Sequence, residues 1–232
     1  MSNEIIWILF ALVNFSLLLL FYRLFGKMGL FVWIGMATVI ANIQVLKTVE
    51  LLGLTATLGN IMYGTAFLAT DILNEKYGKK EAKKAVWLGF TTLITMTLVM
   101  QGALQFEPGA DDIAQGALEG IFGLIPQVAA GSLAAYIISQ YSDVWIYDKL
   151  RKLFPTNKHL WIRNNGSTAI SQLLDTAVFC TIAFYGQFPL SIWIEIFITT
   201  YIIKFVVALM DTPFMYIAKS MHNNKETKSD SY

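Results

Sequence analysis

Long apolar stretches dominate this sequence and decide what it can fold into. Seven of them approach the ~20 mostly apolar residues that an α-helix needs to cross a bilayer. They span about 4–23, 29–50, 54–74, 85–106, 118–141, 166–186 and 190–217. Strands are not expected, because the stretches are unbroken rather than alternating and too long for a membrane barrel. We predict an all-α, polytopic transmembrane helix bundle.

Composition supports a lipid environment and argues against several classes of function. Hydrophobic residues make up 56% of the chain and charged residues 14%, against about 25% charged residues in soluble domains. A net charge of +1 gives no reason to expect a nucleic-acid partner. The single Cys180 and the well-separated His159 and His222 offer no metal site and no catalytic centre. We therefore expect no cofactor and no enzymatic activity.

The basic residues between the stretches predict the direction of each helix. Lys and Arg concentrate in the cytoplasmic loops of membrane proteins. Every Lys and Arg except Lys47 and Lys204 falls between stretches one and two, three and four or five and six, or after stretch seven. The first stretch lacks a preceding basic region and a following cleavage site, so we expect it to remain as a helix. These features predict a multi-pass protein of the cell membrane with its N-terminus outside.

The chain is expected to form a single transmembrane domain over 1–221, followed by a disordered cytoplasmic tail over 222–232. The break at Leu51-Leu52-Gly53, between the second and third stretches, is minimal. Pro126 predicts a kink in the stretch 118–141, and Gln127 would donate into the cavity that this kink opens. The loops are too short for an ATPase. The sequence leaves open whether the protein forms a homodimer.

Polar residues inside the sixth and seventh stretches indicate a pathway for a polar solute, because a charge inside the membrane is costly unless it is paired or hydrated. Ser171, Gln172 and Asp175 fall on one helical face. Hydrogen bonding between helices would account for Ser171, whereas Asp175 favours a function. Lys204 lies mid-stretch and could pair with Asp175 or with Asp211, either structurally or as a proton-linked switch.

The second and third stretches add further candidates. Tyr63, Phe67 and Asp71 lie along one face, and Asn42 falls about mid-membrane. Asp71 could simply pair with the lysines that follow it. A carboxylate accepts two parallel N–H hydrogen bonds, an amide N–H donates to a carbonyl, and an aromatic ring stacks on a heterocycle. This inventory suits a neutral heterocycle with several donors and acceptors better than a sugar or a bare ion.

Two segments resemble the signatures of a known family. Ala41-Asn42, Tyr63 and the run FLATDILNEKYG at 67–78 look like the first signature of the queuosine precursor transporters. The run SQLLD at 171–175, followed by IAF at 182–184, is similar to the second. Lys204 stands where such proteins carry a lysine in their last helix. The resemblance covers about residues 29–217.

The resemblance implies uptake of 7-deazaguanine bases (the 7-cyano or 7-aminomethyl forms, or queuine) for salvage into transfer RNA. It also implies a six-helix core similar to the substrate-binding components of energy-coupling-factor transporters, to which the helix at 4–23 is an addition. The candidate substrate-binding residues are Asn42, Tyr63, Phe67, Asp71, Gln127, Ser171, Gln172, Asp175 and Lys204.

Two alternatives remain at this stage. The chain could be the substrate-binding subunit of a vitamin importer of the energy-coupling-factor type, which would need an ATPase and a coupling membrane protein. It could also be a membrane enzyme acting on a lipid, for which Asp71 and Glu75 are the only carboxylate pair suitably placed. The second alternative is the least favoured, because no histidine lies within reach of that pair.

Overall fold

The computed structural model describes residues 2–154, 160–184 and 186–221. Its elements, in chain order, are α1 (Asn3–Gln44), β1 (Thr48–Leu51), β2 (Leu54–Thr57), α2 (Asn60–Tyr77), α3 (Lys79–Ala103), α4 (Gln115–Phe122), α5 (Ile125–Leu153), α6 (Leu160–Phe184) and α7 (Leu190–Met221). The predicted helical bundle is confirmed as a class. The predicted tail 222–232 lies outside the described residues, and the extent of the transmembrane domain stays a prediction.

The helix α1 contains the first two predicted helices as two arms that reverse direction at Gly26. This residue has φ 56° and ψ −137°, a conformation far from helical that glycine adopts more readily than other residues. A Cβ on Gly29 would lie 2.3 Å from the carbonyl oxygen of Phe21, so the arms meet closely just after the turn. The Asn3 amide donates to the carbonyl of Glu50 at 2.9 Å, which shows that the chain has returned to its starting end.

A β-hairpin replaces the expected join between the second and third predicted helices. Strands β1 and β2 pair antiparallel, with Thr48 opposite Thr57, so the prediction of helix up to residue 50 and again from 54 was wrong. Leu52 and Gly53 at the turn have φ of 53° and 76°. Two positive φ values are the mark of the tight turn that best fits the twist of a hairpin. The β-branched residues of TVEL and TAT also favour strands over helix.

Contacts with α7 hold this hairpin in place. The backbone N–H of Thr55 donates to the carboxylate of Glu195 at 3.0 Å. The Thr199 hydroxyl donates to the carbonyl of Thr55 at 2.8 Å. At the hairpin turn, the backbone N–H of Leu52 donates to the carboxylate of Glu4 on α1 at 3.0 Å. The hairpin therefore joins the starts of α1 and α7, and it leads directly into α2.

The helix expected to kink at Pro126 is interrupted just before this residue. The helix expected at 118–141 is divided into α4 and α5, and Pro126 lies in the first turn of α5. Proline is well tolerated there, because the first N–H groups of a helix have no partner inside the helix. Helix α5 then continues to Leu153, and the lysine-rich segment expected to be a loop forms the start of α3.

The charged segments predicted to share one side do meet in the structure. Lys27 forms an ion pair with Glu81 at 2.8 Å, and its ammonium lies 5.6 Å from the ring centre of Tyr77. Lys76 lies 5.7 Å from the ring centre of Tyr22. The turn within α1 and the junction of α2 with α3 therefore lie together, at the end of the molecule away from the hairpin.

Several helices are long and apolar enough to cross a membrane. Among the described residues these are Asn3–Gln44, Lys80–Ala103, Gln115–Ser139 and Leu190–Ala218, and Ala169–Phe184 is apolar but shorter. A multi-pass membrane protein is therefore confirmed, whereas a count of seven spans stays a prediction. Helix α2 falls outside this group because it carries Asp71, Glu75 and Lys76 within 18 residues.

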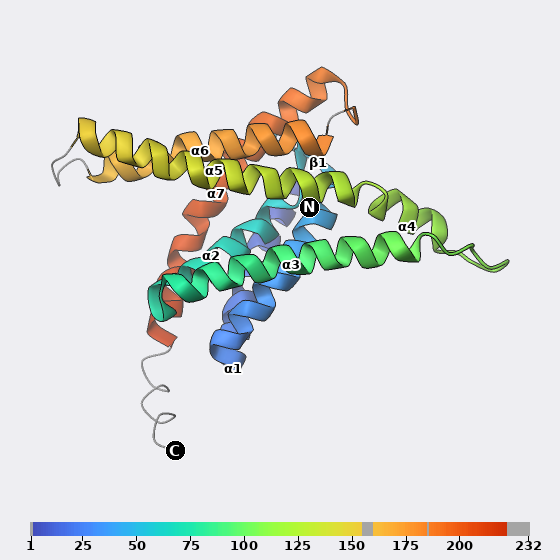
Figure 1. The fold of residues 1–232 in the computed structure, drawn as a ribbon, viewed down its shortest axis with the longest axis horizontal. Coiled ribbons are helices and arrows are strands. Elements are labelled where there is room, and N and C mark those ends of the chain that lie inside the picture. Colours follow the sequence, from blue (N-terminus) through green and yellow to red (C-terminus); the bar gives the residue numbers. More distant parts are fainter. Residues whose placement is uncertain (1, 155–159, 185, 222–232) are drawn as a thin grey trace, which may run out of the picture.

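Helix packing creates the frame around the site. Figure 1 shows α5 and α6 side by side along nearly their whole length, while α1 and α7 run across the direction of α3, α5 and α6. Helix α2 packs against α1, α3 and α7. A Cβ on Gly64 of α2 would lie 2.1 Å from a methyl group of Val207 on α7, so only glycine allows this approach. Small residues at helix contacts permit such close packing in membranes.

We expect Gly64→Ala to lower the thermal stability of the detergent-purified protein, because the new methyl group overlaps Val207. Overpacking of this kind costs about 1–3 kcal/mol. Adding Val207→Ala should restore most of the loss. Gly102→Ala on α3 is the matched control, because a Cβ there meets nothing within 4 Å. Equal melting temperatures for the Gly64 and Gly102 variants would contradict the close α2–α7 contact.

Candidate functional site

A buried ion pair between α6 and α7 lies at the centre of the candidate site. The Lys204 ammonium donates to the carboxylate of Asp175, and the two side chains are 12% and 10% exposed. The same ammonium lies 3.5 Å from the hydroxyl of Thr176 and 5.8 Å from the ring centre of Tyr63. Of the two acidic partners considered for Lys204, the structure therefore selects Asp175.

This ion pair costs free energy to bury, which makes its position informative. Removing two charges from water carries a penalty that their mutual attraction repays only with good geometry. Apolar residues would join α6 to α7 at lower cost, and interior membrane charges commonly mark a ligand or ion pathway. Asp175 and Lys204 are therefore taken as the centre of the candidate site.

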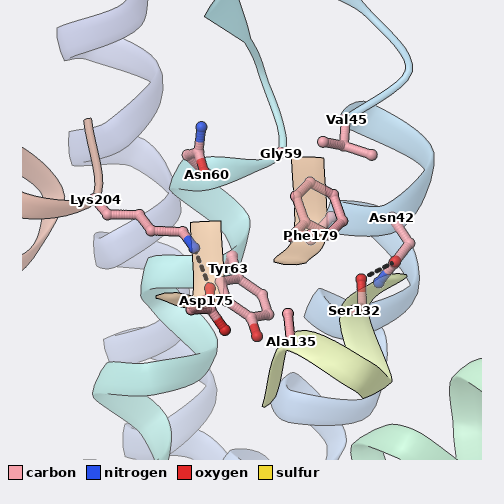
Figure 2. A pocket seen from close by; sticks show the side chains of 11 residues that line it. Asn42, Val45, Gly59, Asn60, Tyr63, Ser132, Ala135, Asp175, Phe179 and Lys204 are labelled. Atoms are coloured by element: carbon pink, nitrogen blue, oxygen red, sulfur yellow. Dashed lines mark hydrogen bonds and ion pairs between the residues drawn. The ribbon is translucent and has the colours of Figure 1, made fainter. Parts of the chain in front are cut away.

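The ion pair forms part of the wall of a cavity that five helices enclose (Figure 2). Its lining residues are Ala41 and Asn42 of α1, with Val45 directly after it; Gly59, Asn60 and Tyr63 at the start of α2; Ser132 and Ala135 of α5; Asp175 and Phe179 of α6; and Lys204 of α7. The space is small, about 40 Å³, which suits a few water molecules. A heterocycle would enter only if aromatic side chains such as Tyr63 and Phe179 moved aside.

Asn42 lines this cavity, but its amide is already engaged. Its amide nitrogen donates to the carbonyl of Thr38 at 2.8 Å. Its oxygen accepts from the hydroxyl of Ser132 at 2.8 Å, a bond that Figure 2 marks with a dashed line. Asn42 therefore lines the cavity and joins α1 to α5, and its role in binding a substrate stays a prediction.

A second and larger cavity begins at Tyr63, which lines both spaces. It has a volume of about 300 Å³ and is bordered by Tyr63, Phe67 and Asp71, together with Thr70, Asn74, Lys83 and Tyr136. The rings of Tyr63 and Phe67 meet edge to face, with centres 4.8 Å apart. Asp71 also faces Asp211 across a separate space between α2 and α7. The structure therefore separates Asp71 from Asp175.

The remaining candidates lie on the surrounding helices. Gln127 donates from its side-chain nitrogen to the carbonyl of Ile182 at 2.8 Å and so joins α5 to α6. Ser171 is buried on α6, one turn before Asp175, and Gln172 is partly buried. None of these three lines either of the two cavities.

Sequence reasoning missed several lining residues, above all Asn60, Ser132 and Phe179. Asn60 begins the same helical face as Tyr63 and Asp71, so its position could have marked it. Ser132 and Phe179 carried no comparable signal. They face the cavity because α5 and α6 cross α1 at this point, and a helical pattern within one segment does not report such a crossing.

Comparison with known proteins places the chain in a family. A family model described as "Putative vitamin uptake transporter" matches residues 57–218. A protein of Bacillus subtilis (strain 168) named "Probable queuosine precursor transporter" is 61% identical over 229 residues, covering 99% of this chain and 100% of the relative. The chain belongs to the queuosine precursor transporter family.

More distant relatives carry similar names. The "Queuosine precursor transporter" of Escherichia coli (strain K12) is 25% identical over 173 residues, 73% of this chain and 75% of the relative. A "Probable queuosine precursor transporter" of Haemophilus influenzae is 25% identical over 161 residues, 67% of this chain and 64% of the relative. No solved structure matches the chain. As a member of this family the protein is a transporter. The family model covers every lining residue of the first cavity except Ala41, Asn42 and Val45.

We expect Asp175→Asn and Lys204→Met each to destabilise the protein, because each leaves one buried charge or polar group without its partner. Breaking a buried pair costs about 3–5 kcal/mol. The double variant should recover much of this loss, since no uncompensated charge remains. Unfolding of the four proteins in detergent, compared as a double-mutant cycle, measures the coupling. Strictly additive losses would show that the two side chains do not interact.

Proposed function

We propose that this protein imports queuosine precursors, 7-deazaguanine bases such as the 7-cyano or 7-aminomethyl forms or queuine, for salvage into transfer RNA. The observation that carries the proposal is the buried Asp175–Lys204 pair in the wall of a cavity enclosed by five helices. Family membership supports the transport of a queuosine precursor. The side chains around the pair support a planar heterocycle as the solute.

Asp175 is the residue proposed to bind the guanine-like edge of the base. This edge presents two parallel N–H donors, and a carboxylate accepts two such bonds side by side. One carboxylate oxygen of Asp175 accepts from Lys204. An incoming base would therefore compete with Lys204 for Asp175. Without this partner Lys204 would change position, because its charge would be left uncompensated. In this proposal the binding of substrate is therefore linked to the α6–α7 contact.

The aromatic side chains are proposed to hold the faces of the ring. Tyr63 and Phe179 both line the first cavity, and stacking on an aromatic ring suits a flat heterocycle. Tyr63 also separates this cavity from the larger one at Phe67 and Asp71. A movement of Tyr63 would join the two cavities into one path. This path runs toward Lys83, near the start of α3.

The energy source distinguishes this proposal from its alternative, a substrate-binding subunit of an energy-coupling-factor importer. Our proposal is that the chain transports by itself, with a six-helix core to which the first arm of α1 is an addition. Reconstitution of the purified chain alone in liposomes tests this point. Uptake of base into these liposomes supports an independent transporter, and binding without uptake supports the alternative.

In cells that lack both synthesis and uptake of queuosine precursors, we expect expression of this chain to restore queuosine in transfer RNA when the correct base is supplied. Each base is fed separately, and modified transfer RNA is measured. Asp175→Ala should reduce rescue to background, because the base loses its carboxylate partner. Asp111→Ala, at an exposed position outside both cavities, should transport normally. Normal rescue by Asp175→Ala at equal membrane levels would exclude the proposed binding site.

We also propose that the hairpin end faces outside and the lysine-rich end faces the cytoplasm. Leu52 at the hairpin tip is 84% exposed and Lys80 is exposed at the start of α3. In a background with Cys180→Ala, a membrane-impermeant maleimide should label Leu52→Cys in intact cells. It should label Lys80→Cys only after the membrane is opened. The reverse pattern would show the opposite orientation.

A further inference from the structure

The start of α2 lies directly at the first cavity. Gly59, which precedes the first turn, and Asn60, the first helical residue, both line the space. No side chain caps this end of the 18-residue helix. The first N–H groups of a helix lack partners within it and carry partial positive charge. The cavity wall therefore offers hydrogen-bond donors at this point.

The Asn60 side chain adds a second, independent feature. The residue is 7% exposed, and its amide nitrogen is buried without a hydrogen-bond partner. A buried amide N–H normally has a partner, because leaving it unpaired forfeits the bonds that it made in water. Asn42 in the same wall and Asn14 elsewhere on α1 both donate to backbone carbonyls. Asn60 is thus the asparagine of the cavity wall with an unused donor.

Close packing fixes the position of Asn60. A Cβ on Gly59 would lie 2.5 Å from the carbonyl oxygen of Ala41 and 3.0 Å from the side chain of Val45. Glycine is required because the end of the second arm of α1 touches the start of α2 here. Figure 2 shows Asn60 and Lys204 on one side of the cavity, with Asn42 and Ser132 on the other. Asn60 therefore lies on the side of the cavity that holds the ion pair.

We propose that Asn60, with the N-terminus of α2, forms a subsite that binds the ring carbonyl of the substrate and so determines specificity. This inference rests on the proposed function. In a 7-deazaguanine the carbonyl is adjacent to the N–H edge assigned to Asp175, so one base would engage both residues. A site built to bond a polar group rejects an analogue that lacks it, because the buried partner is left unpaired.

A comparison of two bases tests this subsite separately from the rest of the cavity. 7-Deazaguanine carries the carbonyl, and its 6-thio analogue keeps the N–H edge but replaces the oxygen with sulfur, a weak acceptor. Binding of each base to the purified full-length protein in detergent is measured by calorimetry. The wild type should bind the oxo base more tightly. Asn60→Ala should weaken binding of the oxo base about 10- to 100-fold and leave the thio base much less affected.

Asn60→Asp provides a second variant of nearly the same size, which donates nothing when ionised and should show the same loss of discrimination. Asn14→Ala is the matched control, because Asn14 is also 7% exposed but does not line the cavity. If the variants that fold bind both bases as the wild type does, or lose both equally, the subsite is excluded while the proposed function stands. If the wild type binds neither base, the proposed function fails, and the subsite fails with it.

Discussion

The buried ion pair between Asp175 and Lys204 is the constraint on which the rest of the site depends. Two opposite charges inside a membrane protein are stable only together, so α6 and α7 must approach at this level. The surrounding helices line the cavity that contains the pair. Each charge of the pair satisfies the other inside the protein. In the proposed mechanism, a base that satisfies Asp175 replaces the bond that Lys204 provides, and Lys204 is freed as the base binds.

Close contacts at glycines determine where the other walls of the cavity lie. In a bilayer, packing and hydrogen bonds rather than a hydrophobic driving force hold helices together. Gly64 allows α2 to touch Val207 on α7, and Gly59 allows the start of α2 to touch the end of the second arm of α1. Gly131 on α5 similarly meets the backbone of α6 near Ala183. These contacts bring five helices to one cavity, and they explain why a single methyl group far from any charge could disturb the site.

The polar residues at membrane depth divide into two groups with different roles. Asn42 and Gln127 have side-chain hydrogen bonds that join helices, α1 to α5 and α5 to α6. Asn60 contributes a donor without such a bond. The first group joins helices of the frame, and the second is the donor of the proposed subsite. This division matters for function, because the residue types are alike and only their partners distinguish a structural amide from one that can read a substrate.

Composition, charge inside apolar stretches and local motifs are properties of the chain alone, and they were enough to predict the helical membrane class, the resemblance to the family and the candidate residues Asp175 and Lys204. The packing of the helices, by contrast, was needed to show that Lys204 pairs with Asp175, that Asp71 lies beside a different cavity and that Asn60 lines the first. The hairpin around Gly53 was also not predicted from the sequence, since the apolar residues there suit either a strand or a helix. Contacts with α7 stabilise the strand. A helical pattern reports which residues share a face, whereas the crossing of helices decides which faces meet.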